Sequence, residues 1–283
     1  MSGHSNREVA ELPRQLVEEA VREHSTSVTG TYPFGARLRC VVQEDRRQKT
    51  VFVLGVYASA VHARWIGPDG RALVRALAVA SEPWIFWDGS AAAEIVAGIA
   101  VPAVAGWLEP TDAKFNGPSG RSLDSDFLVP LGVTRSDAWL CDLVPHTCLN
   151  TSQLRAIKRA YVPRREALKL PSVDLPLVPK GFANDKRRHE ILAEIEQADP
   201  EVVMLLGDQP IRHFLSGFEH RWRRLTDFGE AGYGRVHEVD IAGRVRSVVP
   251  VAHPRQVAAL GRYSPVWRQR HEHWKRHLAP RLL

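Results

Sequence analysis

The sequence contains no apolar run that approaches the roughly 20 residues needed for a transmembrane helix. It has only three cysteines, Cys40, Cys141 and Cys148, without CxxC spacing. This usage argues against a zinc ribbon or an iron-sulfur cluster and fits a reducing compartment. Residues 1–25 carry acidic side chains within an apolar periodicity, so we predict an amphipathic helix there rather than a signal peptide. We therefore expect a cytoplasmic protein that does not bind membranes.

The chain is long enough to form a substantial core. Its 283 residues are 44% hydrophobic and 25% charged, and a chain of this size buries about three quarters of its unfolded surface. There is no internal repeat and no low-complexity tract. We expect a monomer with a single domain over residues 1–283, carrying an insertion at about 58–114.

Positive charge is concentrated in two places. The net charge is +6, and residues 262–283 hold six Lys or Arg and one Glu, a net charge of +5. We predict a basic helix here, at about 264–279. A second basic cluster, from Arg155 to Lys169, is interrupted only by Glu166. Such clusters suit a nucleic acid backbone, but solvated helix faces explain them equally well.

Four short apolar runs predict buried parallel strands. They are rich in Val and Leu and are separated by helical patterns, which favours an α/β layer fold. The runs span 50–57, 137–144, 201–207 and 245–254. Ligands of such sheets bind at the carboxyl ends of the strands. We therefore expect the residues at these four ends to converge.

Five motifs occur in an order that resembles the uracil-DNA glycosylase superfamily. They are VLGVYAS at 53–59, FNGPSGRSLD at 115–124, RSDAWLCDLV at 135–144, DPEVVMLLGDQPI at 199–211 and VPVAHP at 249–254. FxGxSGxxLD is the most specific of them. The resemblance implies a three-layer α/β/α sandwich with a central four-stranded parallel sheet. It also implies a monofunctional DNA glycosylase without a cofactor, with DNA crossing the carboxyl ends of the strands.

The resemblance assigns roles to several residues. Breaking an N-glycosidic bond places negative charge on the departing base, so a donor to its O2 atom stabilises the transition state. His253 occupies that position, and Phe115 matches the aromatic residue that stacks on the flipped base. The remaining residues that the resemblance places against the base are Gly55, Val56 and Asn116, and it places Ser119 and Gly120 against DNA.

Asp142 departs from the family pattern, which has an Asn that reads uracil. A carboxylate only accepts hydrogen bonds. It would oppose uracil O4, whereas it accepts from the exocyclic amine of cytosine, a contact worth roughly 1–3 kcal/mol. We therefore predict that the base is a cytosine derivative. The alternative is that Asp142 caps a loop while another residue reads the base.

The first motif also departs from the family, which commonly places a water-orienting Asp, Asn or Glu there. Here Val56 and Tyr57 stand in its place, followed by Ser59. We expect Tyr57 and Ser59 to take part in catalysis, although a tyrosine is no general base at neutral pH. Either a carboxylate from elsewhere enters the site, or the bond breaks dissociatively and water is captured late. The candidate carboxylates are Glu82, Asp88 and Asp112.

The insertion carries four of the eight tryptophans, namely Trp65, Trp84, Trp87 and Trp107. Tryptophan faces suit the stacking of a sugar, but filling a local core explains them at least as well. A glycosylase for plain cytosine would attack its host genome. A requirement for hydroxymethyl or glucosyl groups on cytosine C5 removes that danger, which is similar to the logic of anti-phage glycosylases that destroy modified phage DNA.

Residues after His253 are expected to grip the DNA. Gln256 or Leu260 is the candidate for the side chain that enters the base stack in place of the flipped base, and Arg255 is adjacent to Gln256 in the sequence. The candidate phosphate-binding cations are Arg262, Arg268, Arg270 and Lys275. His271, His273 and His277 have cationic neighbours and no obvious fourth ligand, so we predict no metal site.

Three hypotheses follow from the sequence. The first is a glycosylase for modified cytosine in anti-phage defence, which leaves an abasic site. The second is a glycosylase for uracil or another deaminated base, in base excision repair. The third is a catalytically silent DNA-binding module with the same fold.

Overall fold

The structure is a computed structural model that describes residues 28–258 and 264–283. The predicted N-terminal helix and two of the predicted DNA-binding residues, Leu260 and Arg262, lie outside these ranges. In the described part of the chain, the strands form two sheets. No helix of the described ranges is long and apolar enough to cross a membrane.

The larger sheet contains the four predicted strands. They are β1 (Val51–Tyr57), β5 (Ala138–Val144), β6 (Val202–Leu206) and β8 (Arg244–Val251). Neighbouring strands in the order β5-β1-β6-β8 are parallel. Nearly every residue of β1, β5 and β6 is buried, which explains their continuous apolar sequences. The predicted α/β class and the parallel strands are confirmed.

A fifth strand, which the sequence did not predict, extends the four parallel strands. Strand β7 (His237–Ile241) pairs antiparallel with β8 through a two-residue turn at Ala242 and Gly243. Both turn residues have positive φ, as a tight hairpin requires. The strand alternates between buried and exposed positions, so it lacks the continuous apolar pattern by which the other strands are recognised.

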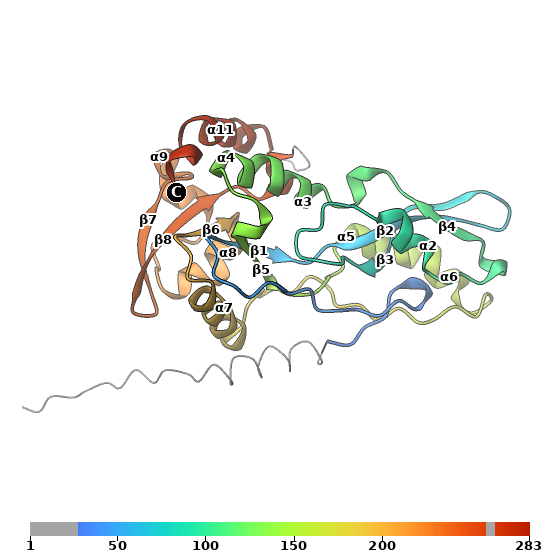
Figure 1. Cartoon of the computed structure of the whole chain (residues 1–283). Coiled ribbons are helices and arrows are strands. Elements are labelled where there is room, and N and C mark those ends of the chain that lie inside the picture. Colours follow the sequence, from blue (N-terminus) through green and yellow to red (C-terminus); the bar gives the residue numbers. More distant parts are fainter. Residues whose placement is uncertain (1–27, 259–263) are drawn as a thin grey trace, which may run out of the picture.

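Helices cover both faces of this sheet. The stretch formed by α3 (Pro118–Ser122), η4 (Leu123–Leu128) and α4 (Val129–Leu131) lies on one side with α11 (Ser264–His277), and α7 (Asp185–Ala198) lies on the other (Figure 1). The short helices α8 (Asp208–His213), α9 (Gly229–Gly232) and α10 (Pro254–Val257) complete this part.

The smaller sheet lies beside the larger one (Figure 1). It contains β2 (Ala60–Ile66), β3 (Ala72–Ser81) and β4 (Trp107–Pro110) in the antiparallel order β3-β2-β4. It is covered by α2 (Ala92–Ala97) and by a helical stretch of α5 (Thr151–Ala156), η6 (Ile157–Tyr161) and α6 (Val162–Arg165). These elements enclose a second hydrophobic core that contains Trp65, Trp87 and Tyr161.

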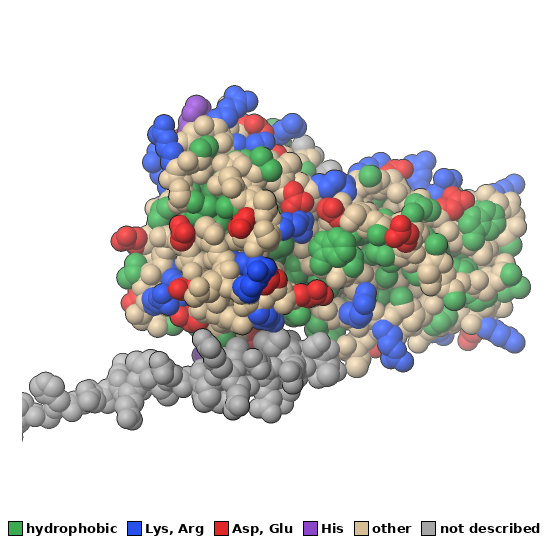
Figure 2. Space-filling model, in the orientation of Figure 1, with side chains coloured by type: hydrophobic (Ala, Val, Ile, Leu, Met, Phe, Trp, Pro, Cys, Tyr) green, Lys and Arg blue, Asp and Glu red, His purple; other side chains and the backbone are tan. Residues whose placement is uncertain are grey.

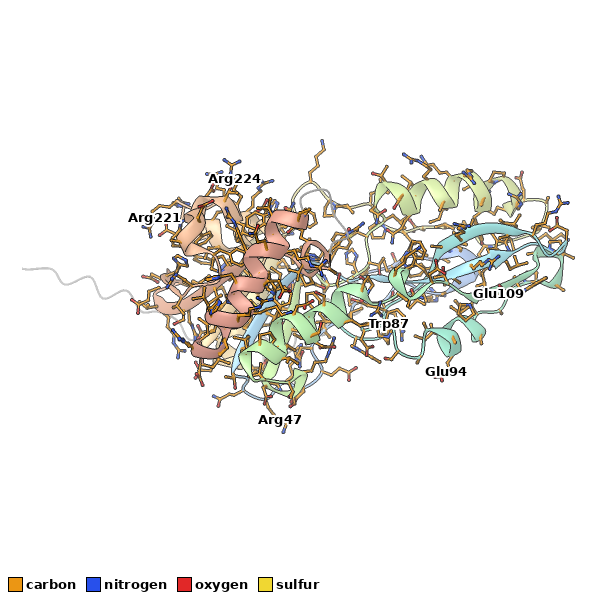
Figure 3. The ribbon with its side chains drawn as sticks, turned by 90° about the horizontal axis from the view of Figure 1, so that it is seen from above. Arg47, Trp87, Glu94, Glu109, Arg221 and Arg224 are labelled. Carbon is orange, nitrogen blue, oxygen red and sulfur yellow. The ribbon has the colours of Figure 1, made fainter. Side chains whose placement is uncertain are left out.

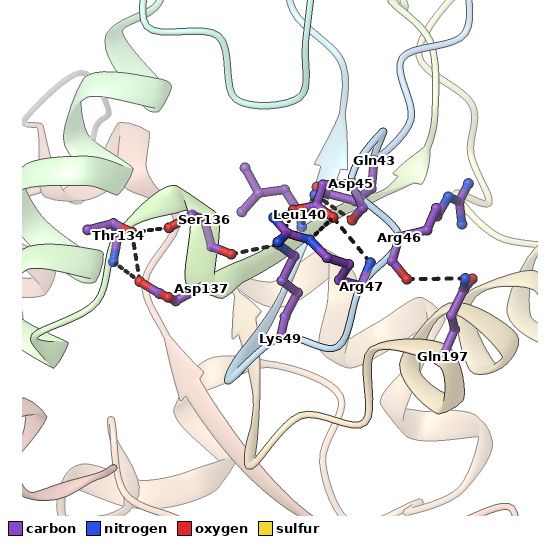
Figure 4. A network of polar contacts seen from close by, with 10 residues as sticks. All are labelled: Gln43, Asp45, Arg46, Arg47, Lys49, Thr134, Ser136, Asp137, Leu140 and Gln197. Carbon is purple, nitrogen blue, oxygen red and sulfur yellow. Dashed lines mark hydrogen bonds and ion pairs between the residues drawn. The ribbon is translucent and has the colours of Figure 1, made fainter.

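Polar contacts hold the amino ends of β1 and β5 together (Figure 4). Lys49 is buried and its Nζ donates to Asp45 Oδ2 (2.5 Å) and to the carbonyl of Ser136 (2.6 Å). The backbone N–H of Leu140 donates to Gln43 Oε1 (3.1 Å). These contacts stabilise the edge of the sheet opposite the strand ends at which parallel sheets bind ligands.

Candidate functional site

A pocket of about 370 Å³ lies at the carboxyl ends of the parallel strands. Each of the four strands contributes residues, namely Val56 and Tyr57 from β1, Asp142 from β5, the segment 206–209 that follows β6, and His253 after β8. The other walls come from Ser59, Glu82, Phe86 and Trp87, from Ser119 and Gly120 on α3, and from Arg255 and Gln256 on α10. The volume is at the lower end of the range for small-molecule pockets, about 300–1,000 Å³.

Asp142 lies at the bottom of this pocket and is only 4% exposed. Burial raises the pKa of Asp142 to about 7, while the charge of Arg187 and a hydrogen bond from the backbone N–H of Val56 act to lower it. Gly55 lies against the Asp142 carboxylate, because a Cβ at position 55 would clash with Asp142 Oδ1 and Phe86 Cζ. At neutral pH this carboxyl group therefore exists in both protonation states.

Glu82 is a second buried acid in the pocket, 3% exposed. Burial raises the pKa of Glu82 well above its ordinary value, and the negative charge of Asp142 raises it further. Hydrogen bonds from the backbone N–H groups of Ser59 and Trp87 act in the opposite direction. Two buried acidic groups that interact resist ionising together, because the charge of one disfavours the charge of the other.

The other two candidate carboxylates lie elsewhere. Asp88 Oδ1 accepts hydrogen bonds from the backbone and side chain of Ser90 (3.1 and 2.6 Å), and Asp112 is exposed and pairs with Lys114 (3.2 Å). Neither of them lines the pocket. Of the three sequence candidates, only Glu82 is brought next to Asp142.

His253 enters the pocket as a neutral side chain with a defined tautomer. Burial lowers the pKa of His253 to about 4, with a smaller contribution from the positive charge of Arg255. His253 Nδ1 accepts a hydrogen bond from the backbone N–H of Arg255 (3.1 Å), at the start of α10. Because a neutral imidazole has one donor and one acceptor, its proton must be on Nε2. His253 therefore offers an N–H donor without a positive charge.

Tyr57 and Ser59 both reach the pocket. The Tyr57 ring stacks on Phe182 at a centroid distance of 6.2 Å, and burial raises the pKa of its hydroxyl. The Ser59 carbonyl accepts a hydrogen bond from Thr147 Oγ1 (2.7 Å). Together with the N–H that it offers to Glu82, Ser59 contributes mainly through its backbone.

Phe115 and Asn116 are not brought to the pocket. Lys114 Nζ lies over the Phe115 ring (5.2 Å), and the Asn116 side chain exchanges two hydrogen bonds with the backbone of His62 on β2 (2.8 and 2.9 Å). The aromatic wall is formed instead by Phe86 and Trp87 (Figure 3 labels Trp87). No motif of the sequence identifies Phe86, although the aromatic run at 84–87 is a signal for it.

Gln209 is a further pocket residue that the motifs did not single out. Its Oε1 atom is buried and has no hydrogen-bond partner among the described residues. An acceptor in this state favours a ligand that brings a donor.

The residues predicted to bind DNA differ in how far they are already paired with other groups of the protein. Arg255 is exposed at the pocket, and the Gln256 side chain accepts from the N–H of His253 (3.2 Å). On α11, Arg268 is exposed, Arg270 pairs with Glu230 (2.8 Å), and Lys275 pairs with Asp126 (2.8 Å). Much of the charge on this helix is therefore balanced within the protein.

The rings of His273 and His277 on α11 lie 4.7 Å apart, whereas His271 has other partners. His271 is buried, and its two ring nitrogens contact the Tyr233 hydroxyl (2.8 Å) and the Asp126 carbonyl (2.9 Å). Within residues 28–258 and 264–283, no group of three His, Cys, Asp or Glu side chains could hold a metal ion. The three cysteines are free.

Comparison with known proteins assigns the chain to a protein family. No curated protein matches the chain. The family model "Uracil DNA glycosylase superfamily" matches residues 95–273, well over half of the chain. The matched region contains α3, β5, β6 and β8, and with them Asp142 and His253. The chain therefore belongs to the uracil-DNA glycosylase superfamily, whose members bind DNA and are generally DNA glycosylases.

Proposed function

We propose that the protein hydrolyses the N-glycosidic bond of a modified cytosine in DNA, such as glucosylated 5-hydroxymethylcytosine, and leaves an abasic site. The observation that carries this proposal is the buried Asp142 at the end of β5, in the pocket that the strand ends form. A role in defence against phages with modified DNA follows from this substrate.

The protonated form of Asp142 is complementary to cytosine. Its carbonyl oxygen accepts from the exocyclic N4 amine, and its O–H donates to N3, which is an acceptor in neutral cytosine. A pKa of about 7 keeps this form populated at neutral pH. An asparagine can form similar hydrogen bonds, but it cannot transfer a proton to the base.

Proton transfer decides whether cytosine can leave. Bond cleavage places an electron pair on the base, and a cytosine protonated at N3 departs as a neutral molecule rather than as an anion. We assign Asp142 as the acid that protonates N3 and His253 as the neutral donor to O2. Burial and the charge of Asp142 raise the pKa of Glu82, so the proton of this pair is held mainly by Glu82. The reactive form that we propose has this proton on Asp142, and in it the ionised Glu82 accepts a proton from the water that attacks the sugar. One proton enters the base and one leaves the water, so the reaction balances.

The substituent on cytosine C5 would meet Gln209 and the aromatic segment 84–87. The unpartnered Gln209 Oε1 supports a substrate hydroxyl as its donor. Trp84 does not line the pocket itself, but it is 42% exposed between the pocket residues Glu82 and Phe86, so we assign it the stacking of a glucosyl group that extends from the pocket.

Uracil is the second candidate, because protonated Asp142 also complements uracil by donating to O4 and accepting from N3–H. Uracil leaves as a more stable anion than cytosine and has less need of proton transfer. Asp142→Asn is therefore expected to lose cytosine excision while retaining or gaining uracil excision.

The experiment uses duplexes that contain uracil, cytosine, 5-hydroxymethylcytosine or its glucosylated form, followed by alkaline cleavage of abasic sites. We expect strand cleavage on the modified cytosines, lost in Asp142→Asn and retained in Phe115→Ala, whose side chain lies outside the pocket. Strand cleavage of the uracil duplex alone would support uracil as the substrate. DNA binding without cleavage of any duplex would indicate a catalytically silent module.

A further inference from the structure

The helical stretch from Thr151 to Arg165 has a strongly basic outer face. Arg155, Lys158, Arg159 and Arg165 are exposed, and Lys169 follows at the end of the stretch. Positions 155, 158 and 159 are spaced so that their side chains share one face of the helix. Glu166 is the only acidic residue between 151 and 170.

The opposite face fixes this helical stretch to the second core. Ile157, Ala160 and Tyr161 are buried there. The Tyr161 hydroxyl accepts from the N–H of Phe34 (3.0 Å) and donates to the carbonyl of Pro171 (3.0 Å). The cations are therefore carried on a firmly packed support.

These cations are not balanced within the described part of the protein. No acidic group in residues 28–258 and 264–283 forms an ion pair with Arg155, Lys158, Arg159 or Arg165, whereas Arg270, Lys275 and Arg276 on α11 all have ion pairs. Charges of both signs are interspersed over the face drawn in Figure 2. A row of unbalanced cations repels itself, and a polyanion is the partner that relieves this cost.

The stretch begins close to the pocket. Gln153 Nε2 lies 3.1 Å from His62 Nε2, and Thr147 Oγ1 donates to the carbonyl of Ser59, a pocket residue (2.7 Å). From there the helix extends along the second sheet, away from the larger one (Figure 1). At the α-helical rise of 1.5 Å per residue its 15 residues span at most about 22 Å, slightly less because Ile157–Tyr161 is π-helical. This length corresponds to roughly six nucleotides of one DNA strand.

We propose that this basic face, formed by Arg155, Lys158, Arg159 and Arg165, binds the phosphate backbone of the DNA that flanks the flipped base. The partner is DNA because the stretch begins near the pocket of a glycosylase family member and its exposed cations follow one another along the chain. The proposal rests on DNA binding by the chain, and it is independent of which base is excised.

The test is the salt dependence of binding to an unmodified 30-base-pair duplex. Arg155→Gln/Lys158→Gln/Arg159→Gln removes three charges while keeping good helix formers on an exposed face. Each lost phosphate contact lowers the slope of log K against log salt by about 0.9, so we expect a decrease of roughly 2–3 and at least about a tenfold loss of affinity at 0.1 M salt. The matched control is Arg46→Gln/Arg47→Gln/Arg244→Gln, which removes three charges at the amino ends of β1 and β8.

Equal slopes and affinities for the two triple variants would overturn the proposal. An unchanged affinity for DNA combined with lost binding of polyglutamate would assign the face to an acidic protein segment, and would overturn it as well. Melting temperatures within about 2 °C of the parent protein exclude unfolding as the cause. Since the duplex lacks a target base, a wrong substrate assignment would leave this result unaffected.

Discussion

Asp142 should make the folded protein less stable as the pH rises. Its pKa increases from an ordinary value of 3.8 to about 7 on folding, because burial disfavours the charged form. The folded state therefore holds this proton more tightly than the unfolded state. The contribution of Asp142 to the free energy of unfolding decreases between these two pH values by about 1.4 kcal/mol per pH unit, or about 4 kcal/mol in all, and changes little above pH 7.

The measurement is urea unfolding of the parent protein and of Asp142→Asn at pH 5 and pH 8. The variant has no ionisable group at this position, and it also relieves Glu82 of a neighbouring negative charge. Relative to the parent, it should gain about 3 kcal/mol in unfolding free energy between pH 5 and pH 8. The contribution of Asp142 changes mainly up to pH 7, so the gain is about 1.4 kcal/mol for each of the two pH units from 5 to 7.

The control is Asp88→Asn. Despite partial burial, which acts to raise it, the pKa of Asp88 is lowered by hydrogen bonds from Ser90, so this group is ionised in both states between pH 5 and pH 8. Asp88→Asn should therefore show the same pH dependence as the parent. A constant stability difference between Asp142→Asn and the parent across the window would refute the placement of a protonated carboxyl group in the pocket.

Three further substitutions test the pocket and its support. Trp84→Ala should lower kcat/KM about tenfold on glucosylated substrates and leave 5-hydroxymethylcytosine unaffected, and equal losses on both would contradict the stacking role. Gly55→Ala should cost about 100-fold in kcat because the new methyl group displaces Asp142, while Gly181→Ala, which meets no atom within 4 Å, should be silent in the same excision assay. Arg187→Met should lower the unfolding free energy by about 3–5 kcal/mol, measured with urea, because it leaves the buried glutamates of α7 without their cation. An unchanged unfolding free energy would show that this network contributes nothing.

The main sheet could be predicted because its strands are buried on both faces. The apolar runs at 50–57, 137–144 and 201–207 have no polar alternation that could be confused with an exposed strand or a surface helix. Strand β7 has that alternation and is only five residues long, and its hairpin turn uses Ala242 rather than the usual Asn or Asp. Its sequence therefore resembled a loop.

Pocket residues could be predicted where they end a strand. Asp142 lies near the carboxyl end of β5 and His253 lies two residues after β8, and the parallel topology brings these strand ends together. Glu82 and Phe86 follow β3 of the other sheet, and the packing between the two sheets places them in the pocket. No local pattern encodes such packing, so the sequence does not distinguish Glu82 from Asp88 and Asp112 and does not identify Phe86. Phe115 was chosen by motif, and the turn at Ala113–Phe115 directs it elsewhere.

The two buried acids of the pocket, Asp142 and Glu82, come from the two different sheets. Asp142 is on β5 of the larger sheet, and Glu82 directly follows β3 of the smaller sheet. A small rotation of one sheet against the other would change the separation of the two carboxyl groups and thus where their common proton resides. DNA bound as proposed, at the helical stretch from Thr151 to Arg165 and at Arg255, would contact both parts of the chain at once and would thereby hold this separation fixed.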